Sequence, residues 1–555
     1  MRRMCRLFVL LSMVAGAAAA PPLTLPPGAD QAEKQITTEA ISGPTRFLAN
    51  DLLEGRGAAS RGDELGCAYI ASVFEYLGLQ PGAPDGSWQQ PFDIVAITAQ
   101  RPEVWSFRSG DQEVSLKQWD DFIAVSGVQQ PSAAIDGAEL VFVGYGIIAP
   151  EFGWDDFKGA DLKGKVLVML NNDPDWDPAL FGGKTRLYYG RWSYKYESAA
   201  RQGAAGAIII HTTPSAGYPY QVVQSSWGGE QFELPAQGEP QIQVKAWATE
   251  DATRRLLAAA GKDLGQLIES AHSKAFRPVP LGITTSLKLA NTLRRVRTVN
   301  VLGLLPGSDP ALKDTVVVYT AHHDHFGIGK PDKTGDRIYN GARDNASGVG
   351  QMLAVAKAFT ALPQAPRRSI LFAAVGVEES GLLGSKYYAT HPTFAPGKIA
   401  ADINFDGANI WGRTKEVAQI GYGKSSLDQI AEAAAARQNR TVVPDQFPDR
   451  GHYYRSDQFN FAKIGVPALY FDLGPDFIGR PEGWGRQQKE AYEKERYHQP
   501  SDEYDSTWNL EGAVEDARVG FISGLAVATM DAMPSWSPGD EFEQARKEAL
   551  AAVRK

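Results

Sequence analysis

Residues that could bind a metal ion stand where predicted β-strands of this chain end. The β-branched run at 316–318 predicts a buried strand, and AHHDH follows it, so that His322 and Asp324 come at its carboxyl end. Asp344 stands further along in ARDNASG, directly before an apolar helical pattern. Open α/β sheets form their sites at the carboxyl ends of their strands. An imidazole and carboxylates at such a place therefore indicate metal-dependent chemistry.

Further candidate groups follow the next predicted strands. SILFAAVGV leads into Glu378 and Glu379, and IAADINF leads into Asp406. YHQP, near the end of the chain, contains His498. Two histidines and three carboxylates suit zinc, for which manganese or cobalt can substitute. Five ligands exceed the needs of one tetrahedral catalytic ion, whereas two ions that share a carboxylate would use all five and keep positions for water and substrate.

The segments that must position these groups alternate between strands and helices. Strands are predicted at 299–304, 314–319, 369–375, 399–404 and 466–471. Helical patterns lie between most of them. The carboxyl half is therefore expected to form the larger part of one α/β domain.

The order of the motifs AHHD, DNASG, EES, NFDG and YHQP resembles that of metallopeptidase family twenty-eight, the co-catalytic di-zinc exopeptidases. That family includes bacterial leucyl-type aminopeptidases and glutamate carboxypeptidases. The resemblance covers about residues 36 to 535, and the stretches LEGRG and RSDQFNFAKIGVPALYF also fit it. It implies a zinc-exopeptidase-type α/β fold in which helices flank a mixed sheet.

The resemblance also implies which residues bind the two zinc ions. It assigns His322 and Asp406 to one ion, and Glu379 and His498 to the other. Asp344 would bridge both. The same pattern implies hydrolysis of a peptide bond by a metal-bridging water.

Residues beside these ligands have supporting roles in the same pattern. Glu378 would be the general base, and Asp324 would orient the histidine ligand two residues before it. Tyr497 is a candidate donor to the oxyanion of the reaction, or else a packing residue. His323 and His325 match no ligand of the family and are expected to be loop residues.

The resemblance leaves the end of the substrate open. The site carboxylates would hold a protonated amine, which favours removal of N-terminal residues from peptides with a free N-terminus. Arg343 departs from the pattern, because many members have an acidic or small residue there. A carboxypeptidase of the same di-zinc family, reading a terminal carboxylate through arginines, therefore remains an alternative. A non-catalytic receptor-like homologue is another, and the oligomeric state stays open.

Composition and the first residues bear on partners and location. A net charge of -9 and an isoelectric point near 5.6 argue against nucleic-acid binding, which needs clustered lysine and arginine. Residues 1–20 have a basic start, an apolar stretch and small residues, which predicts a signal peptide cleaved after Ala20 and a periplasmic or secreted protein. No other stretch is apolar enough to predict a membrane span. Cys5 would leave with the signal, so that only Cys67 remains and no internal disulfide is expected.

A chain of 555 residues is expected to form more than one domain. After a flexible leader at 21–35, we predict a peptidase domain in two parts, 36–129 and 271–535, followed by a C-terminal helical tail at 536–555. The strands AELVFVGYGI, DLKGKVLVML and AAGAIIIH resemble a mainly β protease-associated domain, inserted at 130–270. We expect this insertion to limit access to the zinc site without taking part in the chemistry, since sites often form at domain interfaces.

Overall fold

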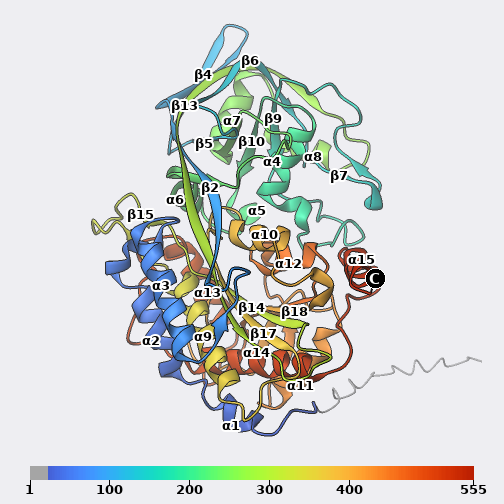
Figure 1. Ribbon diagram of the computed structural model, residues 1–555. Coiled ribbons are helices and arrows are strands. Elements are labelled where there is room, and N and C mark those ends of the chain that lie inside the picture. The colour runs from blue at the N-terminus through green and yellow to red at the C-terminus, as the bar shows by residue number, and fades with distance from the viewer. Residues whose placement is uncertain (1–22, 555) are drawn as a thin grey trace, which may run out of the picture.

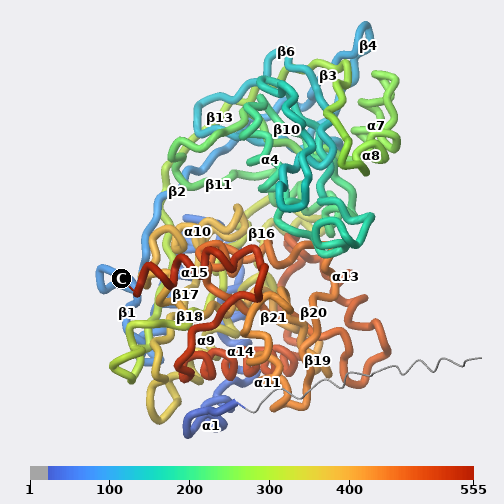
Figure 2. The backbone as a smooth tube through the Cα atoms, turned by 90° about the vertical axis from the view of Figure 1, so that its right-hand side faces the viewer, coloured from blue at the N-terminus to red at the C-terminus, as the bar shows by residue number. Residues whose placement is uncertain are grey.

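The computed structural model describes residues 23–554, which form two lobes stacked along the long axis of the molecule (Figure 1). The signal peptide predicted at 1–20 lies outside the described residues. Two antiparallel strands, β2 (Gln89–Gln100) and β13 (Val279–Leu305), run from one lobe into the other, and Figure 2 shows β2 between the lobes from the side. Hydrogen-bonded strands therefore join the two lobes.

The lower lobe in the view of Figure 1 contains a mixed sheet. Its central strands β17, β14, β18 and β21 are parallel neighbours in that order. β13 pairs antiparallel with β17, β19 pairs antiparallel with β21, and β20 pairs parallel with β19. The bounds are β14 (Val316–His322), β17 (Ser369–Val375), β18 (Ile399–Asn404), β19 (Glu416–Ile420), β20 (Thr441–Pro444) and β21 (Ala468–Leu473).

Helices cover both faces of this sheet. One face packs against α2 (Thr38–Leu48), α3 (Arg61–Tyr76), α9 (Ser347–Thr360), α11 (Leu427–Ala436) and α14 (Glu511–Thr529). The other face packs against α10 (Leu383–Thr390) and α12 (Gln458–Lys463). The prediction of an α/β fold with a mixed sheet flanked by helices is therefore confirmed.

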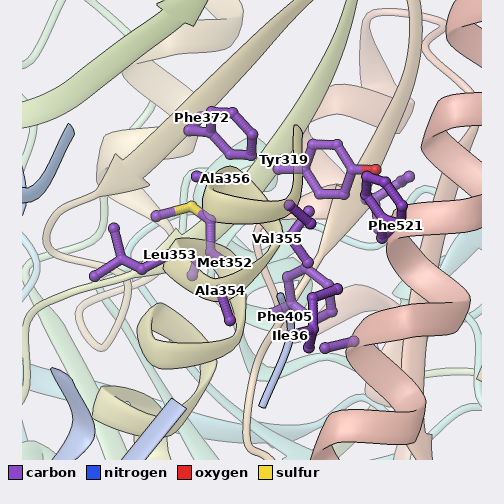
Figure 3. Packing of buried hydrophobic residues seen from close by; sticks show 14 of the residues in the cluster. Ile36, Tyr319, Met352, Leu353, Ala354, Val355, Ala356, Phe372, Phe405 and Phe521 are labelled. Carbon is purple, nitrogen blue, oxygen red and sulfur yellow. The ribbon is translucent and has the colours of Figure 1, made fainter. Parts of the chain in front are cut away.

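The central strand β14 is apolar on both sides because both of its faces are covered. Val317 and Tyr319 point into the core beneath α9 and α14, whereas Val316 and Val318 point into the core beneath α10 and α12. Figure 3 shows the first of these cores, where the ring of Tyr319 lies near Phe521 of α14. A buried parallel strand of this kind delivers its last residue to a fixed position at the sheet edge.

Three further helices, α1, α13 and α15, belong to the lower lobe. α1 (Ala29–Glu33) falls in the segment predicted as a leader, and its Ala29 and Ala32 are buried. α13 (Trp484–Glu495) precedes the YHQP motif. α15 (Glu543–Ala552) lies in the predicted C-terminal tail, and its buried Arg546 donates to the carbonyls of Pro534 and Ile399.

The upper lobe is built around another part of the same continuous sheet, in which β6, β9, β10 and β12 are parallel neighbours and β5 pairs antiparallel with β12. Its strands are β3 (Val104–Ser109), β4 (Gln112–Lys117), β5 (Phe122–Ser126), β6 (Ser132–Phe142), β9 (Val166–Leu170), β10 (Gly206–His211), β11 (Gln231–Glu233) and β12 (Val244–Thr249). Its longer helices are α4 (Trp192–Arg201), α6 (Tyr220–Gly228), α7 (Glu250–Ala259) and α8 (Leu264–Ala271).

The upper lobe has hydrophobic cores of its own. One of them includes residues from Ala99 to Leu289, so that β3 and β5, which precede residue 130, pack with the strands that follow it. The boundaries of the inserted domain at 130 and 270 stay a prediction. Among residues 23–554, no helix combines the length and the hydrophobicity that crossing a membrane requires.

Gly524 of α14 tests how tightly this fold is packed. A Cβ atom there would lie 1.8 Å from the hydroxyl oxygen of Tyr319, which donates to the carbonyl of Gly520 over 3.0 Å. We expect Gly524→Ala to lower the free energy of unfolding by about 1–3 kcal/mol through overpacking. Chemical denaturation measures this change. Gly43→Ala in α2 is the control, because no heavy atom of residues 23–554 lies within 4 Å of its Cβ position, apart from its chain neighbours and its own helix backbone; equal effects of both substitutions would contradict the packing argument.

Candidate metal centre

The five predicted ligands lie together at one edge of the lower sheet. β17, β14 and β18 are parallel neighbours, so their carboxyl ends meet at this edge. His322 is the last residue of β14, Glu379 follows β17, and Asp406 follows β18. Asp344 lies in the turn before α9, and His498 follows α13. Residues that are far apart in the sequence thus converge on a single place.

Asp344 stands between two groups of ligand atoms. Its Oδ1 lies 3.1 Å from His322 Nε2, and its Oδ2 lies 3.3 Å from His498 Nε2. Asp406 Oδ1 lies 3.4 Å from His322 Nε2, while Glu379 Oε2 lies 3.1 Å from His498 Nε2. The two groups share one carboxylate, whose oxygens face different histidines. The assignment of each residue to one of two ions stays a prediction.

The donor atoms fit a bound cation. His498 Nε2 and Glu379 Oε1 are buried, and their close neighbours among residues 23–554, Glu379 Oε2 at 3.1 Å and His325 Nδ1 at 2.6 Å, do not have hydrogen-bond geometry. Buried polar atoms without a partner cost free energy, as do carboxylates crowded together away from water. An ion between the imidazoles and the carboxylates would satisfy these atoms. The mixed nitrogen and oxygen set is one that zinc accepts.

The charges of the ligands are strongly coupled. Burial lowers the pKa of His498, but Glu379 and Asp344 raise it to about 9. Burial likewise lowers the pKa of His322, which Glu378 and other carboxylates raise well above its ordinary value. The pKa of Asp344 is raised by burial and lowered more strongly by the two histidines, so that it falls well below its ordinary value. Without an ion, the protons held by His322 and His498 therefore stabilise the crowded carboxylates.

Asp324 connects the loop that follows β14 to the loop that follows β17. Its Oδ1 accepts a hydrogen bond from the backbone N–H of Glu378 over 3.0 Å, and its Oδ2 accepts one from Glu379 over 3.4 Å. Asp324 Oδ1 also lies 3.7 Å from His322 Nδ1, and its backbone oxygen lies 3.2 Å from the same nitrogen. This carboxylate therefore fixes a histidine ligand and the adjacent glutamates together.

Glu378 is placed to exchange a proton next to the ligands. It is buried, and its Oε2 lies 3.9 Å from His322 Nε2. Burial raises its pKa well above the ordinary value, and the negative charges of Glu379, Asp406 and Asp457 raise it further, against the opposing effect of His322. A carboxyl group with a raised pKa can take up and release a proton near neutral pH.

Comparisons with known proteins support the same chemistry. Residues 300–522 match the model of peptidase family M28. All five candidate ligands lie within these residues. Together with aminopeptidases among its relatives, the match supports a peptidase of the M28 family.

Two curated relatives extend the comparison. Leupeptin-inactivating enzyme 1 of Streptomyces exfoliatus is 27% identical over 267 residues, which are 47% of this chain and 55% of that protein. A probable leucine aminopeptidase 2 of Aspergillus oryzae is 28% identical over 417 residues, which are 72% of this chain and 69% of that protein. The chain thus spans little more than half the length of the Streptomyces relative.

A solved structure shares the fold. An aminopeptidase from Aneurinibacillus sp. strain AM-1 aligns with a TM-score of 0.51 and 19% identity, over 90% of this chain and 95% of that one. At this identity the likeness concerns the fold alone. The shared fold covers most of the described residues.

The candidate metal centre opens on one side into a small pocket of about 80 Å³. Two of the candidate ligands, Asp344 and Asp406, line this pocket together with Glu378. Its other polar lining residues come from loops, helices and strand β21: Arg343, His452, Arg455, Ser456, Asp472, Lys489, Glu493, Tyr218, Tyr470, Tyr492 and Tyr497. A pocket of this size can hold a single small group of a substrate.

Arg343 lines this pocket but is already engaged. Its Nε donates to the carbonyl of Ala408 over 3.1 Å, and its Nη2 lies 3.8 Å from Asp472. The guanidinium also lies over the rings of Tyr492, at 4.6 Å, and Trp411, at 5.3 Å. The arginine beside the bridging aspartate therefore builds the pocket wall as well as carrying charge.

On the other side, the centre opens into a cleft of about 750 Å³ between the lobes. Glu379, Asp324 and His325 line it from the lower lobe. Trp119 and Ser226 line it from the upper lobe. A peptide chain fits this cleft, so both lobes would contact an extended substrate.

Tyr497 lies where an oxyanion donor would be useful. Its ring stacks on that of His498 with centroids 3.7 Å apart, and its hydroxyl accepts a hydrogen bond from Arg455 over 3.0 Å. The hydroxyl proton is thus directed away from the arginine. A role as donor to the reaction stays a prediction.

The two histidines expected to be loop residues are both buried. His325 Nδ1 lies 2.6 Å from Glu379 Oε1, so this residue belongs to the surroundings of the metal centre and is more than a loop residue. His323 faces away, and its Nδ1 lies 3.0 Å from Asp63 Oδ1, with Cys67 alongside. Strand alternation would place two residues at i and i+2 on the same side, so the chain must turn after β14 ends at His322 to give them different surroundings.

Other residues support the site without a motif that points to their role. Asp502 accepts hydrogen bonds from the backbone N–H of Arg343 and of Asp344, at 3.2 and 3.1 Å. Buried Arg56, in the LEGRG stretch, donates to the carbonyls of His323, at 2.8 Å, and of Gly341, at 3.0 Å. Asp502 follows the YHQP motif closely, and this position is the only sequence signal for its role.

We expect metal binding to release protons. At pH 7 the metal-free histidines are protonated, because the pKa of His498 is about 9 and that of His322 is well above its ordinary value. Coordination through Nε2 requires neutral imidazoles, so zinc should displace at least one proton from each histidine, and its affinity should fall as the pH decreases below 9. Titration calorimetry of the metal-free protein in buffers with different ionisation enthalpies measures this release. A heat that is independent of the buffer would contradict it.

Proposed function

We propose that this protein is an exported di-zinc exopeptidase that removes N-terminal residues from peptides. The observation that carries the proposal is the position of Asp344, whose two oxygens face His322 and His498. The match to family M28 and the aminopeptidase relatives support a peptidase. The basic start, apolar stretch and small residues of 1–20 support export to the periplasm or the medium.

Two zinc ions in this centre would supply a bridging water with a lowered pKa and would polarise the scissile carbonyl group. His322 and Asp406 would hold one ion, Glu379 and His498 the other, and Asp344 both. Manganese or cobalt could replace zinc, because nitrogen and oxygen ligands accept all three.

The protein's own groups then handle the proton and the developing charge. Glu378 takes a proton from the attacking water and passes it to the leaving amine, for which its burial and its place beside the ligands suit it. The hydroxyl of Tyr497 donates to the oxyanion. Asp324 keeps His322 and the two glutamates in register throughout.

The shape of the site supports action at a chain end. The small pocket takes the terminal residue, and the wide cleft takes the rest of the peptide. The carboxylates of Asp344, Glu378 and Asp406 line the pocket next to the scissile bond, where they can hold a protonated α-amine. The upper lobe, which contains the protease-associated domain proposed for 130–270, forms one wall of the cleft.

A carboxypeptidase of the same type is the second candidate, and one observation favours it. Arg455 lines the small pocket, and it forms no ion pair with a carboxylate of residues 23–554. Arg450 is paired with Glu493, whereas Arg455 is available for a substrate carboxylate. A non-catalytic receptor is the weaker alternative, because it would not need Glu378 beside a complete ligand set.

Exchange of the two adjacent glutamates separates the base from the ligand. We expect Glu378→Gln to retain zinc but to lose about 10²–10⁴-fold in kcat, since an amide cannot accept the proton. Glu379→Gln should instead lose zinc from the His498 side. Metal content after dialysis and single-substrate kinetics measure both effects. Loss of zinc from Glu378→Gln with retention in Glu379→Gln would reverse the two roles.

Three peptides of one sequence decide which end is read. We expect a free peptide and one amidated at its C-terminus to be shortened stepwise from the amino end, while an N-acetylated peptide resists, because its amine cannot be charged. Mass spectrometry follows the products. Shortening of the acetylated peptide from its carboxyl end would establish the carboxypeptidase instead, and no cleavage of any peptide would leave the exopeptidase proposal without support.

A further inference from the structure

The upper lobe touches one of the candidate metal ligands directly. Ser226 of α6 places its Oγ 2.9 Å from His498 Nδ1, across 272 positions of the sequence. The opposite ring nitrogen, Nε2, is the one that faces Glu379 and Asp344. The serine and the candidate ion would therefore lie on opposite sides of the same imidazole.

This contact has the chemistry of a ligand support. A histidine that binds a metal through Nε2 carries its proton on Nδ1, and that N–H needs an acceptor to fix the ring and its tautomer. The hydroxyl oxygen of Ser226 is at the right distance to accept it. His322 finds its partner within its own loop, at the backbone oxygen of Asp324, over 3.2 Å. His498 is supported from the other lobe.

The upper lobe holds Ser226 firmly in place. Arg101 donates to the carbonyls of Trp227, at 2.9 Å, and Gly228, at 2.8 Å, at the end of α6. Gln224 donates to the carbonyl of Trp119 over 2.8 Å. The ring of Trp227 packs within the core of the lobe, against Trp192, Tyr196 and Trp247. The position of the hydroxyl is thus set by the packing of the upper lobe.

The aromatic neighbours of His498 in the lower lobe restrict its ring but do not accept its Nδ1 proton. Tyr497 stacks on the face of the His498 ring, and Phe326 lies 4.6 Å from it, centroid to centroid, so these neighbours restrict the ring plane. Neither an aromatic face nor a phenyl edge accepts the in-plane Nδ1 proton. Only a polar atom in the plane of the ring can choose which nitrogen is protonated.

We propose that Ser226 is a positioning residue for His498, so that the upper lobe completes one half of the metal centre. The inference rests on the proposed di-zinc function and goes beyond it, because it gives the inserted lobe a part in holding the metal. Separation of the lobes would weaken zinc binding at His498 while leaving the His322 side intact.

The test compares zinc affinities of full-length variants. Ser226→Ala should weaken one of the two zinc ions by about 10–100-fold and leave the other unchanged, as loss of a partner to a ligand histidine does elsewhere. Ser226→Thr, which keeps the hydroxyl, should restore the affinity. Ser225→Ala is the matched control, since its hydroxyl donates to the carbonyls of Gln221 and Val222 and accepts from Gln499 of the lower lobe at 3.5 Å, but does not contact the histidine. Competition with a chromophoric chelator measures both dissociation constants.

The outcomes separate this inference from the proposed function. Wild-type affinity in Ser226→Ala, equal weakening of both ions, or the same loss in Ser225→Ala would overturn the positioning role. Thermal unfolding of the metal-free variants identifies general damage, and an affinity loss accompanied by a lower Tm that Ser226→Thr shares would also overturn it. A wild-type protein that binds two zinc ions yet cleaves no peptide would remove the exopeptidase function alone.

Discussion

Negative charge that is buried at one edge of the sheet is the constraint on which the rest of the structure depends. Asp344, Glu378, Glu379 and Asp406 crowd around two histidines, and each of these side chains is buried or half-buried. Carboxylates in such surroundings are costly unless cations or N–H donors offset them. Asp324 takes up backbone donors, the histidines bring positive charge when protonated, and the centre can hold cations. The folded lower lobe and the proposed catalyst thus solve the same electrostatic problem.

Much of this arrangement can be predicted from the sequence, because it depends on short segments and the residues that directly follow them. A buried parallel strand is a short apolar run, and the residue that follows it must stand at the sheet edge. His322, Glu379 and Asp406 each follow such a run, so their convergence can be expected from strand order alone. Asp344 is as predictable, since a turn before an apolar helix leads back to the same edge. The identity of the fold class follows from the same alternation of strands and helices.

The remaining features could not be predicted, because they depend on contacts between segments far apart in the chain. His325 looks like a loop residue in the sequence, yet it packs against Glu379 once β14 and β17 are neighbours. Ser226 stands in an ordinary polar stretch, and only the docking of α6 on the lower lobe brings it to His498. The role of Arg343 cannot be assigned from the sequence, because it depends on the rings and the carboxylate around the guanidinium. Spacing and periodicity carry no information on such contacts.

The ladder between β2 and β13 bears on how a two-lobed molecule of this kind can arise. Gln100 lies opposite Ala290, and the pairing continues without a break to Gln89 and Val301 beside the lower sheet. Partners in an antiparallel ladder lie about 5 Å apart, so everything between these strands leaves and re-enters the lower lobe at nearly one point. In evolutionary terms, a short hairpin connection between β2 and β13 could be replaced by a whole lobe at this ladder without altering the register of the sheet. A contact such as that of Ser226 could then be acquired afterwards, turning an appendage into a component of the site.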